Sequence, residues 1–126
     1  MRILLIDDDT LFLTFMEGAL RQKGYDVVSA QDGKQAREAL GGKKLDLIIS
    51  DVFMPTLDGI RFHSYVREFT DARDTPFIFI SAYDDQHLRN LMIDSANDYF
   101  LRKPVPVEAI LSLIETVLRP PPAEHP

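Results

Sequence analysis

Short apolar runs alternate with longer segments of helical periodicity along almost the whole chain. The strand-like runs lie at residues 2–6, 25–30, 45–50, 76–80 and 98–101, and the helix-like segments lie at 10–23, 33–40, 58–70, 85–95 and 106–118. Central runs that are apolar throughout are typical of a parallel sheet with helices on both faces. The alternation therefore predicts an α/β fold, a three-layer doubly wound sandwich with a five-stranded parallel sheet and five helices.

The helix-like segments carry signals for their own ends. Asp9 stands directly before the first one and is expected to be its N-cap, while Gly24 and the Gly41-Gly42 pair are expected to end the first two. Apolar residues recur at helical intervals in the first and last segments, at Leu11, Phe15, Met16, Ala19 and Leu20 and at Val107, Ile110, Leu111, Ile114 and Leu118.

The chain of 126 residues has the size of one ordinary domain, which we place at residues 1–118. The Pro-rich residues 119–126 are expected to form a tail or the start of a linker. No apolar stretch reaches the ~18 to 20 residues that a membrane helix needs, and the first residues lack a secretory signal, so we expect a cytoplasmic protein.

Two features of the composition narrow the chemistry. The absence of cysteine excludes disulfides, a thiolate nucleophile and zinc-cysteine sites, so any site must use oxygen and nitrogen groups. A net charge of -6 argues against direct contact with nucleic acid, since domains that bind phosphate backbones usually carry a basic face.

Aspartates follow two of the predicted strands. Asp7, Asp8 and Asp9 come after the first strand and Asp51 after the third. Ligands bind at the carboxyl ends of strands in open parallel sheets, so Asp7, Asp8 and Asp51 converge on one pocket if the first and third strands are neighbours. Three anions in one concavity require a cation, and oxygen-only ligation suits Mg²⁺, with Mn²⁺ as a substitute.

The ends of the last two strands supply groups that suit a phosphoryl ligand. Ser81 offers a hydroxyl and Lys103 a positive charge. Phosphoryl transfer asks mainly for positioned charge of this kind. Asp51 lies centrally in the predicted pocket and could attack as a carboxylate, forming an acyl phosphate.

Four segments in the same order resemble the receiver domains of two-component response regulators, the CheY-like family. They are "LLIDDD" (4–9), "IISDVFMPTLDG" (48–59), "IFISAY" (78–83) and "YFLRKPV" (99–105), and the resemblance covers residues 1 to about 118. It implies a flavodoxin-like fold with strand order 2-1-3-4-5. It also implies that Asp51 is the phosphoacceptor and that Asp7, Asp8, Asp51 and the backbone carbonyl of Phe53 hold Mg²⁺.

The resemblance also assigns the switch residues. Ser81 is similar to the switch hydroxyl, where threonine is also common, and Phe100 to the aromatic that changes rotamer, where tyrosine is frequent. Lys103 is similar to the phosphate-binding lysine, and its bond to Pro104 to the family's cis peptide. The two positions that flank the approach of water to the phosphate are Phe53 and Tyr83, whose aromatic rings we expect to slow hydrolysis.

A receiver takes a phosphoryl group from a sensor histidine kinase or phosphotransfer protein and is not an enzyme in the usual sense. The resemblance implies switching through the face of helix 4, strand 5 and helix 5, a downstream protein or output domain beyond residue 126 as partner, and a phosphorylation-dependent homodimer as a further assembly.

The alternative class is a haloacid-dehalogenase-type phosphatase with Asp7 as nucleophile, because "DDDTL" (7–11) is a near miss for D-x-D-G-T-L. That class usually needs a longer chain, and it leaves "SDVFMPTLDG" (50–59) unexplained. His63, His87 and His125 have no ligand-like spacing and are expected at the surface or the edge of the core.

Overall fold

The computed structural model describes residues 1–54, 57–69, 74–81 and 97–118, without the side chains of 53–54, 57–60 and 69. The expected helix at 85–95 and the expected tail at 119–126 lie outside this part of the chain. The described elements, in chain order, are β1 (Arg2–Ile6), α1 (Thr10–Gln22), β2 (Asp26–Ala30), α2 (Gly33–Leu40), β3 (Leu47–Asp51), β4 (Phe53–Met54), β5 (Leu57–Asp58), α3 (Gly59–Phe69), β6 (Phe77–Ser81), β7 (Asp98–Arg102) and α5 (Val107–Leu118).

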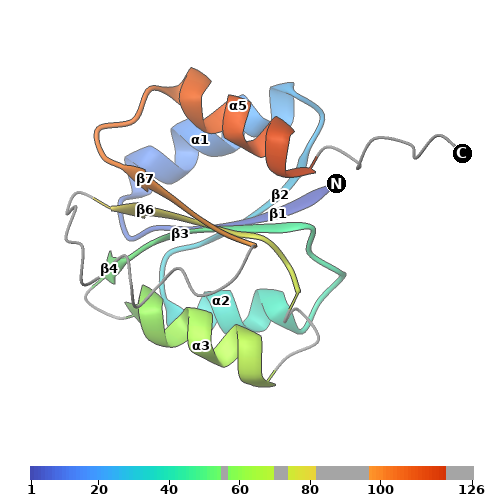
Figure 1. The fold of residues 1–126 in the computed structure, drawn as a ribbon, viewed down its shortest axis with the longest axis vertical. Coiled ribbons are helices and arrows are strands. Elements are labelled where there is room, and N and C mark those ends of the chain that lie inside the picture. Colours follow the sequence, from blue (N-terminus) through green and yellow to red (C-terminus); the bar gives the residue numbers. More distant parts are fainter. Residues whose placement is uncertain (55–56, 70–73, 82–96, 119–126) are drawn as a thin grey trace, which may run out of the picture.

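A five-stranded parallel sheet forms the middle layer, in the order β2-β1-β3-β6-β7. Helices α1 and α5 cover one face and α2 and α3 the other (Figure 1). If the five strands of this sheet are numbered in chain order, with β6 as the fourth and β7 as the fifth, their order is 2-1-3-4-5. The doubly wound sandwich and this strand order are therefore confirmed, with four of the five expected helices among the described residues. The short antiparallel pair β4–β5 was not predicted; it lies between the expected strand at 45–50 and the expected helix at 58–70.

The two faces of the sheet have separate apolar cores because strand side chains alternate between them. Leu4 and Ile6 of β1 pack with α2 and α3, through residues such as Ala36 and Phe62. Ile3 and Leu5 pack on the other side, with the buried residues of α1 and α5. Two cores against one sheet leave only its edges and strand ends to carry polar chemistry.

Helix α1 begins and ends where the sequence indicates. The Asp9 side chain accepts the backbone N–H groups of Leu11 and Phe12, which confirms Asp9 as the N-cap. Gly24 follows the helix with φ of +91°, a conformation that glycine adopts without strain. The buried stripe, however, consists of Leu13, Met16 and Leu20.

Two apolar residues of the predicted stripe do not belong to it, because Leu11 is 81% exposed and Phe15 is 62% exposed. Both lie on the outer side of α1. Across the described residues, no helix combines the length and the apolar character required to cross a membrane.

Of the two places expected for His63, the surface is excluded, because this side chain is buried at the amino-terminal end of the sheet; His87 and His125 lie outside the described residues. His63 is 3% exposed, and its Nε2 lies 2.9 Å from Oδ1 of Asp98, which also accepts a 2.8 Å hydrogen bond from Arg67. Spacing along the sequence could not reveal this cluster, because α3 meets β7 only in the folded chain. Burial opposes ionisation of Asp98, but His63 and Arg67 outweigh it and lower its pKa to about 2.

The Asp98 cluster predicts a specific pH dependence of stability. The pKa of Asp98 in the folded protein lies below its ordinary value of 3.8, so its carboxylate stabilises the fold above that pH, and the contribution is lost as the pH falls towards 2. The shift corresponds to about 2 kcal/mol. Denaturant unfolding of Asp98→Asn at pH 4 and pH 2 should show a pH effect smaller than the parent's by this amount.

The matched control is Asp26→Asn. The Asp26 carboxylate also forms an ion pair, with Arg2, but the Asp26 side chain is 70% exposed. We expect this variant to keep the parent's pH dependence. An Asp98→Asn variant whose stability falls between pH 4 and pH 2 as steeply as the parent's would contradict the assignment.

Candidate functional site

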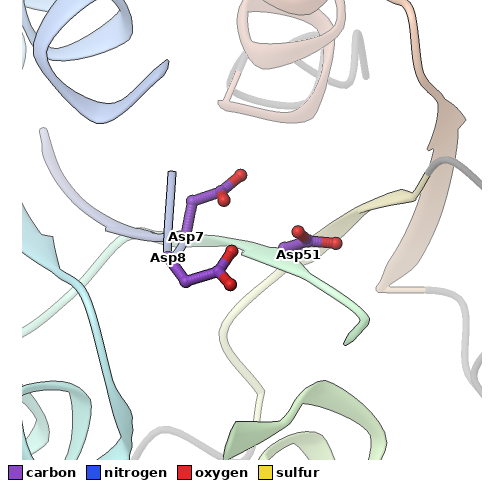
Figure 2. Close-up of side chains that lie close together, drawn as sticks. All are labelled: Asp7, Asp8 and Asp51. Atoms are coloured by element: carbon purple, nitrogen blue, oxygen red, sulfur yellow. The ribbon is translucent and has the colours of Figure 1, made fainter. Parts of the chain in front are cut away.

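Three carboxylates converge at the carboxyl ends of neighbouring strands. Asp7 and Asp8 directly follow β1, and Asp51 is the last residue of β3, which pairs with β1. One carboxylate oxygen from each residue lies within 4.8 Å of the others. Figure 2 shows the three side chains close together at one end of the sheet. The structure thus brings together the three aspartates that the sequence analysis selected.

Asp7 is the most enclosed of the three, at 1% exposed. Its backbone N–H donates to the carbonyl of Ala30, and its Oδ1 accepts the backbone N–H of Asp9 at 2.9 Å. Burial raises the pKa of Asp7, and the charge of Asp51 adds to this, although Asp9 and Lys103 act in the opposite direction. A buried carboxylate whose pKa is raised in this way remains short of positive charge.

Lys103 supplies positive charge to the pocket from just beyond β7. Its ammonium Nζ lies 3.0 Å from Oδ2 of Asp7 and 3.4 Å from Oδ2 of Asp51. Burial alone would lower the pKa of Lys103, but the hydrogen bonds and charges of Asp7 and Asp51 raise it, so the side chain is a cation.

The backbone around Lys103 is held by its neighbour in the sheet. The Lys103 N–H donates to the carbonyl of Ser81 at 2.7 Å, and the Lys103–Pro104 peptide bond is cis, as the resemblance implies. This contact ties the end of β7 to the end of β6, next to the end of β3.

Ser81 and Phe100 lie on the two strands beside Asp51. Ser81 is the buried last residue of β6, and Asp51 pairs in register with Ile80 directly before it. Phe100 is partly buried against the core on the α2–α3 face and pairs with Phe79. Phe79 and Ser81 are alternate residues of β6 and share a face of the sheet, so Phe100, which pairs with Phe79, lies on the same side as Ser81. Phe100 is two residues before the end of β7.

Of the two residues expected to flank the phosphate, the structure describes only the backbone of one. Phe53 begins β4, two residues after Asp51, so its carbonyl lies in the segment that leaves the carboxylate pocket. Tyr83 lies outside the described residues.

One residue that contacts the pocket was not predicted from the sequence. The aromatic ring of Phe12, in the first turn of α1, lies beneath the Lys103 ammonium, with Nζ 4.9 Å from the ring centroid. The one feature of the sequence that points to this contact is the position of Phe12, about one helical turn after Asp9.

The donor set can be tested against Mg²⁺. The ion prefers oxygen ligands, keeps several waters and is usually held by one or two carboxylates together with a phosphate. The pocket offers oxygen atoms from three carboxylates, one buried, one intermediate and one exposed, so it has both fixed ligands and a side open to solvent. The raised pKa of Asp7 points the same way, because a divalent cation would compensate its burial. The residues fit the ion.

Comparison with known proteins places this arrangement in a family. Residues 3–115 match the family model described as "Response regulator receiver domain". The response regulator MprA of Mycolicibacterium vanbaalenii is 33% identical over 118 residues, and the alkaline phosphatase synthesis transcriptional regulatory protein PhoP of Bacillus subtilis is 30% identical. These alignments cover 94% of this chain but 50% and 48% of the relatives, so the chain spans about half the length of the curated relatives it matches.

Solved structures agree with this placement. The chemotaxis response regulator CheY4 of Vibrio cholerae is 27% identical, with a TM-score of 0.84 over 93% of this chain and 98% of that one. The receiver domain from the hybrid histidine kinase CckA is 28% identical, with a TM-score of 0.77 over 94% of this chain and 100% of that one. The family match also decides against the haloacid-dehalogenase alternative. This chain belongs to the receiver domains of two-component response regulators.

Proposed function

We propose that this receiver takes a phosphoryl group onto Asp51 from a phosphohistidine of a sensor histidine kinase or phosphotransfer protein, in a reaction that depends on Mg²⁺. The observation that carries the proposal is the pocket itself, in which Asp7, Asp8 and Asp51 come within 4.8 Å and the Lys103 ammonium contacts two of them. The role is that of a signalling module, with slow self-dephosphorylation and no turnover of a substrate.

The chain's own residues divide the work. Asp51 attacks phosphorus in line through a carboxylate oxygen, and the bond from phosphorus to the donor's histidine nitrogen breaks on the opposite side. The Lys103 ammonium, which contacts Asp51 before the reaction, then neutralises the phosphoryl group that Asp51 has received. The lysine needs to move only a short distance for this. Asp7 and Asp8 would hold the metal, together with Asp51 and the backbone carbonyl of Phe53. The ion would supply charge neutralisation on the phosphoryl oxygens.

Ser81 and Phe100 are proposed to convert phosphorylation into a change of shape. The Ser81 hydroxyl would follow the new phosphoryl oxygens, and Phe100 would move into the space it vacates on the same side of the sheet. The face built from residues 84–118 would then be remodelled, which is helix 4, strand 5 and helix 5 of the family. The added charge of the phosphoryl group is sufficient to remodel this face if the face has two conformations and the charge favours one of them.

The output of the switch is proposed to lie with another protein, an output domain beyond residue 126 or a phosphorylation-dependent homodimer. The relative from Bacillus subtilis is by name a transcriptional regulatory protein and is about twice as long as the matched region. This relative does not support the expectation of no nucleic-acid contact, which rests on the net charge of -6 alone.

Replacement of the phosphoacceptor gives the most direct test. Asp51→Asn keeps the shape of the side chain and removes the attacking oxygen anion, so we expect incubation with acetyl phosphate and Mg²⁺ to add one phosphate to the parent and none to the variant. Intact-mass spectrometry measures the addition, and circular dichroism checks the fold. Labelling of the variant at the parent's level would exclude Asp51 as the acceptor, and many turnovers of p-nitrophenyl phosphate by the parent would instead indicate a phosphatase.

The metal site predicts a stability increment in the absence of any phosphoryl donor. Mg²⁺ binds only where the carboxylates are gathered, so at about ten times its dissociation constant it should stabilise the folded state by ~1.4 kcal/mol. Asp8→Ala should remove most of the increment, whereas Glu115→Ala, an exposed carboxylate on α5, should not. Thermal unfolding with and without Mg²⁺ measures both, and equal increments in parent and Asp8→Ala would refute the site.

The lifetime of the phosphorylated state tests the proposed shielding by Phe53 and Tyr83. Water must approach Asp51 in line, and neither aromatic side chain offers a group that orients it. We expect Phe53→Asn and Tyr83→Glu each to shorten the lifetime several-fold, measured as first-order loss of phosphate from purified phosphoprotein in Mg²⁺. If neither variant hydrolyses faster than the parent, the rings do not shield the phosphate, and the role of Asp51 is unaffected.

A further inference from the structure

We infer that Phe12 is a positioning residue for the phosphoryl-transfer site, because its ring holds the Lys103 ammonium over the carboxylate pocket. The inference rests on the proposed function, in which Lys103 neutralises the transferred group. It adds a residue from a different element, the first turn of α1, to a site otherwise built from the ends of strands.

The geometry is that of a cation–π contact. Lys103 Nζ lies over the Phe12 ring at 4.9 Å from its centroid, within the ~6 Å over which such contacts are attractive. The same ammonium donates to Asp7 at 3.0 Å and to Asp51 at 3.4 Å. Among the described residues, the ammonium therefore has a ring on one side and two carboxylates at hydrogen-bonding distance.

The ring is itself held firmly. Phe12 is partly buried against the core that α1 and α5 share, and its backbone N–H donates to Oδ1 of the N-cap Asp9 at 3.2 Å. The Asp9 backbone N–H in turn donates to Asp7. The segment that carries the acid pair therefore also sets the place of the ring, which fixes Phe12 relative to the pocket.

A neutral partner suits a lysine whose other partners change during the reaction. In the proposed function Asp7 becomes a metal ligand and Asp51 becomes an acyl phosphate, so neither carboxylate remains available to the ammonium in the same form. The Phe12 ring undergoes no such change. It also attracts a cation without cancelling its charge, which leaves the full charge of Lys103 for the phosphoryl oxygens.

Ordinary core packing is the competing explanation for Phe12, and the variants are chosen to separate the two. Phe12→Leu keeps an apolar side chain and removes the π face, whereas Phe12→Tyr keeps the face. Phe15→Leu removes an aromatic ring of the same helix that is 62% exposed, and serves as the matched control. If Phe12 served only core packing, Phe12→Leu would lower the stability of the fold. It would not slow phosphorylation in a way that Phe12→Tyr avoids.

The first measurement is the initial rate of phosphorylation by acetyl phosphate in saturating Mg²⁺, a small donor that needs no docking surface. We expect Phe12→Leu to be about two- to fivefold slower than the parent, the rate equivalent of one partly exposed cation–π contact, with Phe12→Tyr and Phe15→Leu near the parent. In a Lys103→Met background, Phe12→Leu should cause no further loss, because the ring then has no cation to hold.

The second measurement needs no phosphorylation. The methylene protons next to the Lys103 ammonium should show an upfield ring-current shift in NMR spectra of the parent and Phe12→Tyr, and lose it in Phe12→Leu. A labelled parent with an undiminished rate in Phe12→Leu, or the same loss in the Lys103→Met background, would overturn the inference alone. An unlabelled parent would overturn the proposed function and the positioning role with it, whatever the NMR shift.

Discussion

The mutual repulsion of three carboxylates at one end of the sheet is the constraint on which the site depends. Asp7 is almost wholly buried, and its raised pKa shows that the contacts within the chain do not fully offset this burial. Lys103 supplies one positive charge, from a position fixed by its backbone hydrogen bond to Ser81. The fold thus holds a pocket that is favourable to added positive charge, and this fits the divalent ion and the phosphoryl group that we propose as its ligands.

The layered fold makes this concentration of charge tolerable. The two apolar cores lie on either face of the sheet and confine the pocket to the strand ends. A second polar cluster, of His63, Arg67 and Asp98, lies at the opposite end and joins α3 to β7. There the contacts with His63 and Arg67 lower the pKa of Asp98 to about 2, whereas the pKa of Asp7 is raised. The contrast distinguishes Asp98, whose charge is offset by its neighbours, from Asp7, whose burial is not fully offset.

The first turn of α1 connects the two halves of the proposed mechanism. Asp9 caps the helix, contacts Asp7 through its backbone N–H, and orients the turn that carries Phe12. A change at this turn would be felt both by the acid pair and by the ammonium above the ring. Leu11 and Phe15 of the same helix are exposed and are not part of this connection.

Local sequence patterns determined the elements of this protein and the residues at the strand ends. Apolar runs and helix signals predicted the doubly wound sheet, because burial on both faces and capping chemistry are read within a few residues. The aspartates and Lys103 could be selected because parallel strands end at one edge. Three outcomes depended on the tertiary structure: Phe12 lies under Lys103, His63 lies beside Asp98, and Leu11 and Phe15 are exposed to solvent. Those outcomes depend on how a helix is rotated against a sheet and which distant strand it meets, and neither is encoded in the spacing of nearby residues.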